Sequence, residues 1–189
     1  MSSRGTPAKP NSRKIWIFGA IFGVVCALVV VLASGFMVET TNTDEFCASC
    51  HVMKPFRSAW KEAVHGGKNR QGFAAQCVDC HLPHGNFLEY LVTKAITGTS
   101  DVIHNLTIDG ETFDWAANAE AKRHKFTYDS ACRHCHYNLT GPGLPTGGLL
   151  AHRAYLRGET NKMCTDCHSH VGHKDMLQTV ETFYQRQKK

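Results

Sequence analysis

Cysteines and histidines that could hold a redox metal group recur along this chain in one fixed pattern, C-x-x-C-H. Two thiols at this spacing can add across the two vinyl groups of a haem, while the histidine that follows reaches the iron. The pattern occurs four times, as Cys47-Ala-Ser-Cys50-His51, Cys77-Val-Asp-Cys80-His81, Cys132-Arg-His-Cys135-His136 and Cys164-Thr-Asp-Cys167-His168. Because these copies use eight of the nine cysteines, the sequence predicts four covalently bound c-type haems.

Three other uses of paired cysteines are a structural zinc site, a thioredoxin-like redox pair and a disulfide framework. Zinc would explain two C-x-x-C pairs that share one metal, but it gives no reason for a histidine directly after every pair. The ninth cysteine, Cys26, lies in an apolar run and is most simply a small hydrophobic residue.

The spacing of the motifs divides them into two pairs. The stretch from Cys47 to Cys77 is nearly as long as the stretch from Cys132 to Cys164, whereas the gap between the second and third motifs is much longer. The second and fourth motifs both read C-x-D-C-H, and each follows a histidine at the same separation, His65 and His152 respectively. We therefore expect a duplicated two-haem unit in which these two histidines do the same job.

That job is predicted to be the distal axial position of a haem, because two histidine ligands give a low-spin, electron-transferring iron. An exposed or hydrogen-bonded imidazole is the alternative for any one histidine. Eight histidines lie outside the motif positions, namely His65, His84, His104, His124, His134, His152, His170 and His173. Spacing favours His65 and His152. His84, which follows the second motif, and His170 and His173, which follow the fourth, are the next candidates.

The first motif differs from the others because it continues as C-x-x-C-H-x-M, with Met53 two residues after His51. Methionine is a known axial haem ligand that raises the reduction potential relative to histidine. The alternative is a methionine that fills a gap in the core.

Between the second and third motifs, residues 87–106 have apolar side chains at helical spacing. Gly98 followed by Thr99 or Ser100 indicates one helix that ends and another that begins. Lys94 and Asp101 are seven residues apart and would share a face only if the helix were continuous. A surface lysine and an aspartate at a helix N-terminus are the alternative.

The elements that must carry these residues begin with an uncharged apolar run from Ile15 to Val38. As a helix with a rise of about 1.5 Å per residue, this run exceeds the roughly 30 Å of bilayer hydrocarbon. A cleaved signal sequence would have a shorter apolar core, so we expect an uncleaved, single-pass anchor. Four Lys and Arg residues precede the run with no acidic residue, which predicts a cytoplasmic N-terminus and a periplasmic haem domain on the cytoplasmic (inner) membrane.

The expected organisation is residues 1–14 as a basic cytoplasmic segment, 15–38 as the anchor and 39–189 as the haem domain. Within this domain we expect one half at about 44–85, an insert at about 86–125 and a second half at about 126–173. About 38 residues are available per haem, too few for a conventional core, so the fold should be mainly α with long loops and should depend on the porphyrins. Beyond Val38 the formal charge is only +1, which gives no argument for nucleic acid binding.

The anchor, the four motifs, the methionine after the first motif, the stretch Ala63-Val64-His65-Gly66-Gly67 and the stretch Cys80-His81-Leu82-Pro83-His84-Gly85 together resemble the NapC/NirT/NrfH family. The resemblance runs from about Ile15 to His173. It implies a membrane-bound tetrahaem cytochrome c that oxidises a quinol, either menaquinol or ubiquinol. The electrons would pass to a periplasmic terminal reductase of anaerobic respiration, nitrate or nitrite reductase first, or to a soluble cytochrome.

The resemblance also implies roles for residues. Met53 rather than His51 would be the axial ligand of the first haem, with Asp101 on its open side and Lys94 beside Asp101 in the quinol site. The proximal ligands of the other three haems would be His81, His136 and His168. The distal ligands would be His173 for the second haem, His65 for the third and His152 for the fourth, while His84 matches a histidine of the NapC-like branch.

Two rival functions follow from the same residues. One is an anchored electron-relay cytochrome without its own quinol site, in which all four haems would be low-spin. The other is a terminal reductase whose first haem binds a small ligand, although the sequence shows no dedicated polar pocket beyond Lys94 and Asp101. A homo- or hetero-oligomer is compatible with every one of these functions.

Overall fold

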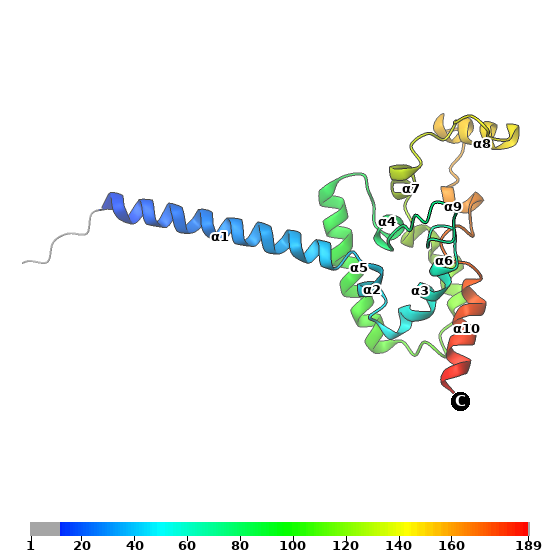
Figure 1. Ribbon diagram of the computed structural model, residues 1–189, viewed down its shortest axis with the longest axis horizontal. Helices are drawn as coiled ribbons and strands as arrows, with labels where there is room; N and C mark the ends of the chain where they lie inside the picture. The colour runs from blue at the N-terminus through cyan, green and yellow to red at the C-terminus, as the bar shows by residue number, and fades with distance from the viewer. Residues whose placement is uncertain (1–11, 189) are drawn as a thin grey trace, which may run out of the picture. The chain divides into compact units, whose positions relative to one another are not determined.

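The computed structural model describes residues 12–188 as helices joined by long loops, without strands in that range apart from one isolated bridge between Gly66 and Ala74. The elements are α1 (Ser12–Thr40), α2 (Asp44–Cys47), η1 (His51–Met53), α3 (Lys54–Lys61), α4 (Val78–His81), α5 (Phe87–Thr107), α6 (Trp115–Phe126), α7 (Asp129–Cys135), α8 (Thr146–Leu156), α9 (Cys164–Cys167) and α10 (Met176–Gln187) (Figure 1). The chain forms two compact units, one ending at Thr41 and the other beginning at Asn42. The predicted class, mainly α with long loops, is confirmed. Most of the predicted cytoplasmic segment 1–14 lies outside the described residues.

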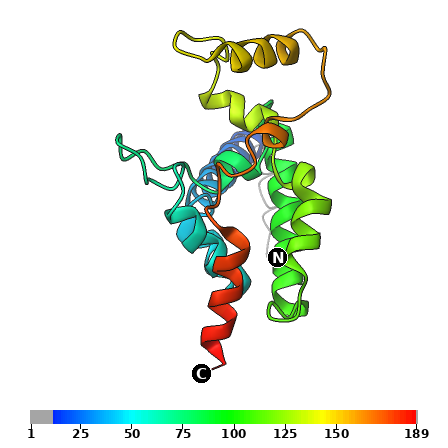
Figure 2. The same cartoon turned by 90° about the vertical axis from the view of Figure 1, so that its right-hand side faces the viewer.

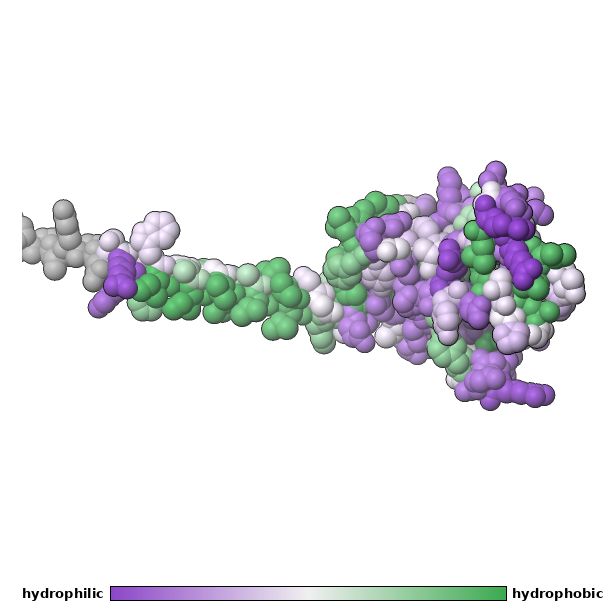
Figure 3. All heavy atoms as spheres, turned by 90° about the horizontal axis from the view of Figure 1, so that it is seen from above, coloured by the Kyte–Doolittle hydropathy of each residue, from purple (hydrophilic) through white to green (hydrophobic). Residues whose placement is uncertain are grey.

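The first unit contains α1, a single uninterrupted helix over the uncharged run. Its 29 residues extend for about 43 Å, more than the roughly 30 Å of bilayer hydrocarbon. None of its residues is buried, and its large side chains, such as Phe18 and Leu32, are exposed. Apolar side chains cover most of the helix in Figure 3, beyond its hydrophilic N-terminal end. The helix is long and apolar enough to cross a membrane once, as the sequence predicted.

The second unit buries few apolar side chains. The buried apolar residues of the described range are mostly small, namely Val52, Ala59, Trp60, Ala63, Ala75, Val78, Leu82, Ala131 and Val180. The polypeptide alone therefore does not enclose a conventional core, which agrees with the expectation that covalently bound porphyrins supply much of the packing.

The expected helix break at Gly98 was wrong, because α5 runs without interruption from Phe87 to Thr107. Its N-terminus is capped by Asn86, whose side chain accepts a hydrogen bond from the backbone N–H of Glu89 at 2.7 Å. The hydroxyl of Thr99 bonds back to the carbonyl of Ala95 at 2.8 Å instead of capping a new helix. A single glycine costs a helix only about 1 kcal/mol relative to alanine, which the rest of α5 can outweigh.

The C-terminal segment after His173, for which the sequence suggested no role, is an ordered helix. α10 (red) runs beside α3 (cyan) in Figures 1 and 2, and Val180 on α10 is buried, with only 3% of its surface exposed. The backbone N–H of Lys174 donates to the carbonyl of Ala59 at 3.1 Å, and Lys188 forms an ion pair with Glu111 at 2.6 Å. The last residues of the chain therefore pack against the helix that follows the first motif.

Candidate functional site

The four C-x-x-C-H motifs lie on or beside short helices. The first motif joins α2 to η1, the second lies on α4, the third ends α7 and the fourth forms α9. A C-x-x-C pair on one helical turn directs both thiols to the same side, as attachment to one porphyrin requires. None of the cysteines in residues 12–188 forms a disulfide.

Contacts between cysteines bring the motifs together in the two pairs that their spacing predicted. The thiols of Cys47 and Cys77 are hydrogen-bonded, which is the main reason that the pKa of Cys47 falls to about 7. Cys132 and Cys164 form the same contact in the second half, where burial is the main reason that the pKa of Cys164 rises to about 12. The first cysteine of each motif thus lies beside the first cysteine of its partner motif.

Two aspartates inside the motifs repeat one structural role. A carboxylate oxygen of Asp79 accepts the backbone N–H of Gln76 at 2.8 Å, and Asp166 accepts that of Met163 at 2.8 Å. Each bond fixes the backbone of the residue directly before the first cysteine of a C-x-D-C-H motif. It therefore stabilises the start of the helical turn that carries the motif. The shared C-x-D-C-H pattern was the signal in the sequence that could have revealed this role.

Three pairs of histidines face each other at nearly the same distance. The ring centroids are 6.1 Å apart for His81 and His173, 6.0 Å for His136 and His65, and 6.2 Å for His168 and His152. A metal–imidazole bond is about 2 Å long and the bonding nitrogen lies ~1.2 Å from its ring centroid, so an ion between two axial imidazoles separates the centroids by roughly 6 Å. The three pairs therefore fit the two sides of a haem iron.

Each distal histidine is oriented by a backbone carbonyl that bonds its Nδ1. The acceptors are the carbonyl oxygens of Val171 for His65 at 3.0 Å, Leu139 for His152 at 2.6 Å and Phe56 for His173 at 3.0 Å. His81 makes the same kind of bond with Phe126 at 2.6 Å. A bond at Nδ1 fixes the ring orientation and leaves Nε2 to coordinate iron, which is the usual arrangement around a metal-bound histidine.

Burial is the main reason that the pKa of His81 and the pKa of His173 are both lowered, the latter to about 4. The nearby His81 lowers the pKa of His173 further, against the opposing bond to Phe56. Both rings are therefore neutral at pH 7, and the neutral form is the one that binds a metal. The donor types, their spacing and their protonation fit haem at these three positions.

The first motif has a different environment, because no histidine among the described residues faces it at the distance of the other pairs. His51 is exposed, while Met53 is half-buried at the end of η1. His84, the remaining ligand candidate, stacks on His134 with centroids 4.8 Å apart, too close for an iron between them. Its Nε2 lies 3.3 Å from the carbonyl oxygen of Val78. The structure thus places His84 in a histidine stack and not in an axial pair.

Lys94 and Asp101 share one face of α5, as the unbroken helix requires for residues two turns apart. The ammonium of Lys94 donates to the side-chain oxygen of Asn42 at 2.6 Å, and the hydroxyl of Tyr90 donates to the same oxygen at 2.8 Å. No pattern in the sequence singles out Asn42, because a single polar residue after an apolar run has many uses.

The charges of Lys94 and Asp101 act on the first haem-attachment motif. Lys94 lowers and Asp101 raises the pKa of the Cys47 thiol, which places both side chains close to that cysteine. Burial lowers the pKa of Lys94 and raises the pKa of Asp101, so both groups are shifted toward their neutral forms. Asp101 retains exposed surface, yet enough protein surrounds its carboxyl to disfavour the charge. A cation and a carboxyl thus lie on the same face of α5, each partly desolvated and each within electrostatic range of Cys47.

The zinc alternative requires several ligands to converge on one point. Across residues 12–188, no group of three or more His, Cys, Asp or Glu side chains is placed to hold a metal ion. The convergence that the chain does show is of histidines in facing pairs beside C-x-x-C turns, which is the donor set of c-type haems.

Comparison with known proteins agrees with this geometry. The chain is 34% identical over 178 residues to the tetraheme c-type cytochrome CymA of Shewanella oneidensis, covering 87% of this chain and 94% of that protein. It is 30% identical over 189 residues to the cytochrome c-type protein NapC of Escherichia coli, covering 89% and 85%. The cytochrome c-type protein TorC of Escherichia coli is 26% identical over 176 residues, which cover 88% of this chain but 44% of that protein.

No solved structure matches the chain. The family profile described as the NapC/NirT cytochrome c family, N-terminal region, matches residues 9–178, from just before the apolar helix into α10. Together with four attachment motifs and three facing histidine pairs, this match shows that the chain belongs to the NapC/NirT family of membrane-anchored tetrahaem c-type cytochromes.

Proposed function

We propose that this cytochrome oxidises a membrane quinol and passes the electrons through its four haems to a periplasmic acceptor in anaerobic respiration. The observation that carries the proposal is that Lys94 and Asp101 share one face of α5, and that Lys94 on this face bonds Asn42, five residues before Cys47 of the first motif. A quinol oxidation site needs a hydrogen-bond donor and a proton acceptor next to an electron acceptor. The partners that we favour are a nitrate or nitrite reductase, with a soluble cytochrome as the alternative acceptor.

We assign the axial ligands from the facing pairs. His81 and His173 hold the second haem, His136 and His65 the third, and His168 and His152 the fourth. Two imidazoles per iron favour low-spin centres that exchange electrons without binding substrate. For the first haem we assign Met53 as the axial ligand with Asp101 on the open side, because no imidazole pair forms there within the described residues.

The residues of the quinol site orient the quinol and accept a proton from it. Oxidation of one quinol to the quinone releases two electrons and two protons. Lys94 donates a hydrogen bond to a quinol oxygen and favours negative charge that develops there, while Asp101 accepts one of the two protons and the other is released to solvent on the periplasmic side. Asn42 positions Lys94 through the bond of 2.6 Å. When bound, the haems supply one-electron transfer away from this site.

The test is quinol-dependent haem reduction by the purified, fully haem-loaded protein. Lys94→Gln and Asp101→Asn should each lower the rate by about 10²-fold, the lower end of what a positioned proton-transfer group contributes. Glu89→Gln on the same helix is the matched control, because Glu89 lies in the first turn of α5 and is not among the charges that act on Cys47. All variants should carry four haems and accept electrons from dithionite.

Wild-type rates in both quinol-site variants would show that Lys94 and Asp101 do not form the site. If the wild-type protein itself were not reduced by menaquinol or ubiquinol analogues, the electron-relay alternative would replace the proposal. In that case, electron paramagnetic resonance should find four low-spin haems, whereas a quinol site at an open first haem predicts a high-spin component.

A further inference from the structure

One face of α5 is apolar and uncovered. Six large side chains on this face are exposed, from 49% for Val92 to 79% for Leu106, and the set comprises Leu88, Val92, Ile96, Val102, Ile103 and Leu106. Their spacing places them on one side of a helix that buries none of its 21 residues. No charged residue interrupts this set along the face. A contiguous apolar surface of this kind marks an interaction site.

The opposite face of α5 contacts the segment that precedes the first motif. Tyr90 and Lys94 both donate hydrogen bonds to Asn42, and Asp101 lies on the same side of the helix. The polar face is therefore turned toward the first motif, and the apolar face is turned outward. This orientation is fixed by contacts within the second unit and does not depend on how α1 is placed.

Asn42 links this arrangement to the membrane through the chain itself. It lies four residues after Val38, the last residue of the uncharged run. Four residues span at most about 14 Å when extended, and the polar layer of a bilayer is roughly 5–8 Å thick on each side. Asn42 therefore lies close to the head-group layer, and the bonds from Tyr90 and Lys94 hold the N-terminal half of α5 at a similar depth.

We propose that α5 is an interfacial helix, with its apolar face at the acyl boundary of the leaflet from which the chain emerges after α1. An amphipathic helix at this position typically buries its apolar side by about 5–10 Å. Lipid is favoured over a protein partner because the two bonds to Asn42, four residues beyond the apolar run, limit the distance of α5 from the bilayer. The inference depends on membrane anchoring and not on quinol oxidation.

The test is photolabelling of the full-length, haem-loaded protein in vesicles of phosphatidylethanolamine and phosphatidylglycerol that contain a diazirine-bearing phospholipid. Peptides from α5 should be labelled several-fold more than peptides from α8. This helix is the internal control, because its Leu150 and Leu156 are also exposed, at 56% and 48%. Labelling of α1 reports correct insertion.

The variant pair Val92→Glu and Ile96→Glu should reduce α5 labelling several-fold while four haems remain attached. Asp101→Asn should leave the labelling unchanged, so failure of the quinol site would not affect this readout. Labelling of α5 no stronger than that of α8, in a sample whose α1 is labelled, would overturn the proposal. Crosslinks from α5 to a second copy or to another protein in place of lipid would also overturn it.

Discussion

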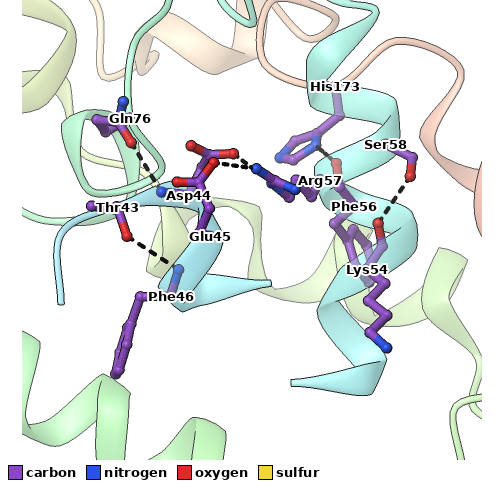
Figure 4. Close-up of polar contacts among 10 residues, drawn as sticks. All are labelled: Thr43, Asp44, Glu45, Phe46, Lys54, Phe56, Arg57, Ser58, Gln76 and His173. Carbon is purple, nitrogen blue, oxygen red and sulfur yellow. Dashed lines mark hydrogen bonds and ion pairs between the residues drawn. The ribbon is translucent and has the colours of Figure 1, made fainter. Parts of the chain in front are cut away.

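The ion pair between Arg57 and Asp44 connects the first haem-attachment motif to α3. Nε of Arg57 donates to a carboxylate oxygen of Asp44, and a second guanidinium nitrogen reaches Glu45 (Figure 4). The backbone N–H of Asp44 donates to the side-chain oxygen of Gln76 at 2.9 Å, and Gln76 directly precedes Cys77. Replacement of Arg57 by methionine keeps most of the side-chain volume but leaves the Asp44 carboxylate without its cation.

The expected decrease in the free energy of unfolding of Arg57→Met lies between two limits. Exposed ion pairs contribute about 0–1 kcal/mol, whereas loss of one partner of a buried pair costs about 3–5 kcal/mol. Only 10% of the Asp44 side chain is exposed and 26% of Arg57, but the protein layer over them is thin, so water still screens the charges. We therefore expect Arg57→Met to lower the free energy of unfolding by about 1.5–2.5 kcal/mol.

The effect should depend on pH. Burial by itself raises the pKa of Asp44, but the hydrogen bonds and the charge of Arg57 outweigh it, so the pKa of the folded state is lowered. The pair thus stabilises the protein fully above the unfolded pKa of about 3.9, and this stabilisation is lost as the pH falls through the lower, folded value. Without Arg57, the strongest opposition to the effect of burial is lost, so the folded pKa of Asp44 is higher in the variant than in the wild type. Ionisation of Asp44 at pH 7 then stabilises the variant less than the wild type. The difference between wild type and variant should therefore shrink toward about pH 3.5.

The assay is guanidinium unfolding of the haem-loaded protein in detergent, followed by far-ultraviolet circular dichroism at pH 7 and below the unfolded pKa, at about pH 3. Lys68→Met is the matched control, because its bond to Glu62 is 3.4 Å long and both side chains are about 60% exposed, so its loss should stay below about 0.5 kcal/mol. Asp44→Asn combined with Arg57→Met should recover part of the loss. Equal losses for Arg57→Met and Lys68→Met at pH 7 would refute the reasoning, as would a loss that does not change with pH.

Three further outcomes follow from single contacts. His152→Met should raise the reduction potential of one haem in a redox titration, because methionine raises the potential relative to histidine, whereas exposed His170→Ala should not change it. Val180→Ala should lower the free energy of unfolding by about 1–2 kcal/mol, since its side chain is buried, while Leu177→Ala, 46% exposed, should cost less than about 0.5 kcal/mol. Tyr184→Phe should be neutral or stabilising in the same assay, because the hydroxyl is buried without a hydrogen-bond partner, and a clear loss would contradict this.

The sequence predicted what depends on short-range spacing. A C-x-x-C-H turn carries its own chemistry, and an uncharged run as long as Ile15 to Val38 exceeds a bilayer wherever it occurs. The pairing of motifs in the structure also followed from two nearly equal gaps. The helical part of the insert was predicted as well, except that Gly98 does not interrupt it.

What the sequence could not predict lies in backbone atoms and in packing. The groups that orient the distal histidines are carbonyl oxygens, such as those of Phe56 and Leu139, and every residue has one. The role of Asn42 depends on where α5 passes, which no local pattern determines. α10 also has no motif, because its function is to pack against α3 and not to bind a cofactor.

The partners of His65 and His152 show what the duplication in the sequence does not predict. Both stand at the same separation before a C-x-D-C-H motif, yet His152 faces His168 in its own half, whereas His65 faces His136 in the other half. Local spacing places the two histidines equivalently on the chain. The partner of each depends on how the halves pack, which the repeated pattern does not record.

The exchange of histidines between halves also explains why the C-terminal segment is ordered. His173 comes from the end of the second half but faces His81 of the first, so the chain must return to α3 to place it. The bond from Lys174 to the carbonyl of Ala59 and the burial of Val180 fix that return directly after the histidine. Each half thus supplies a proposed ligand that the other lacks, and we infer that neither half could hold its haems alone. The helix without a motif is what positions the last of these ligands.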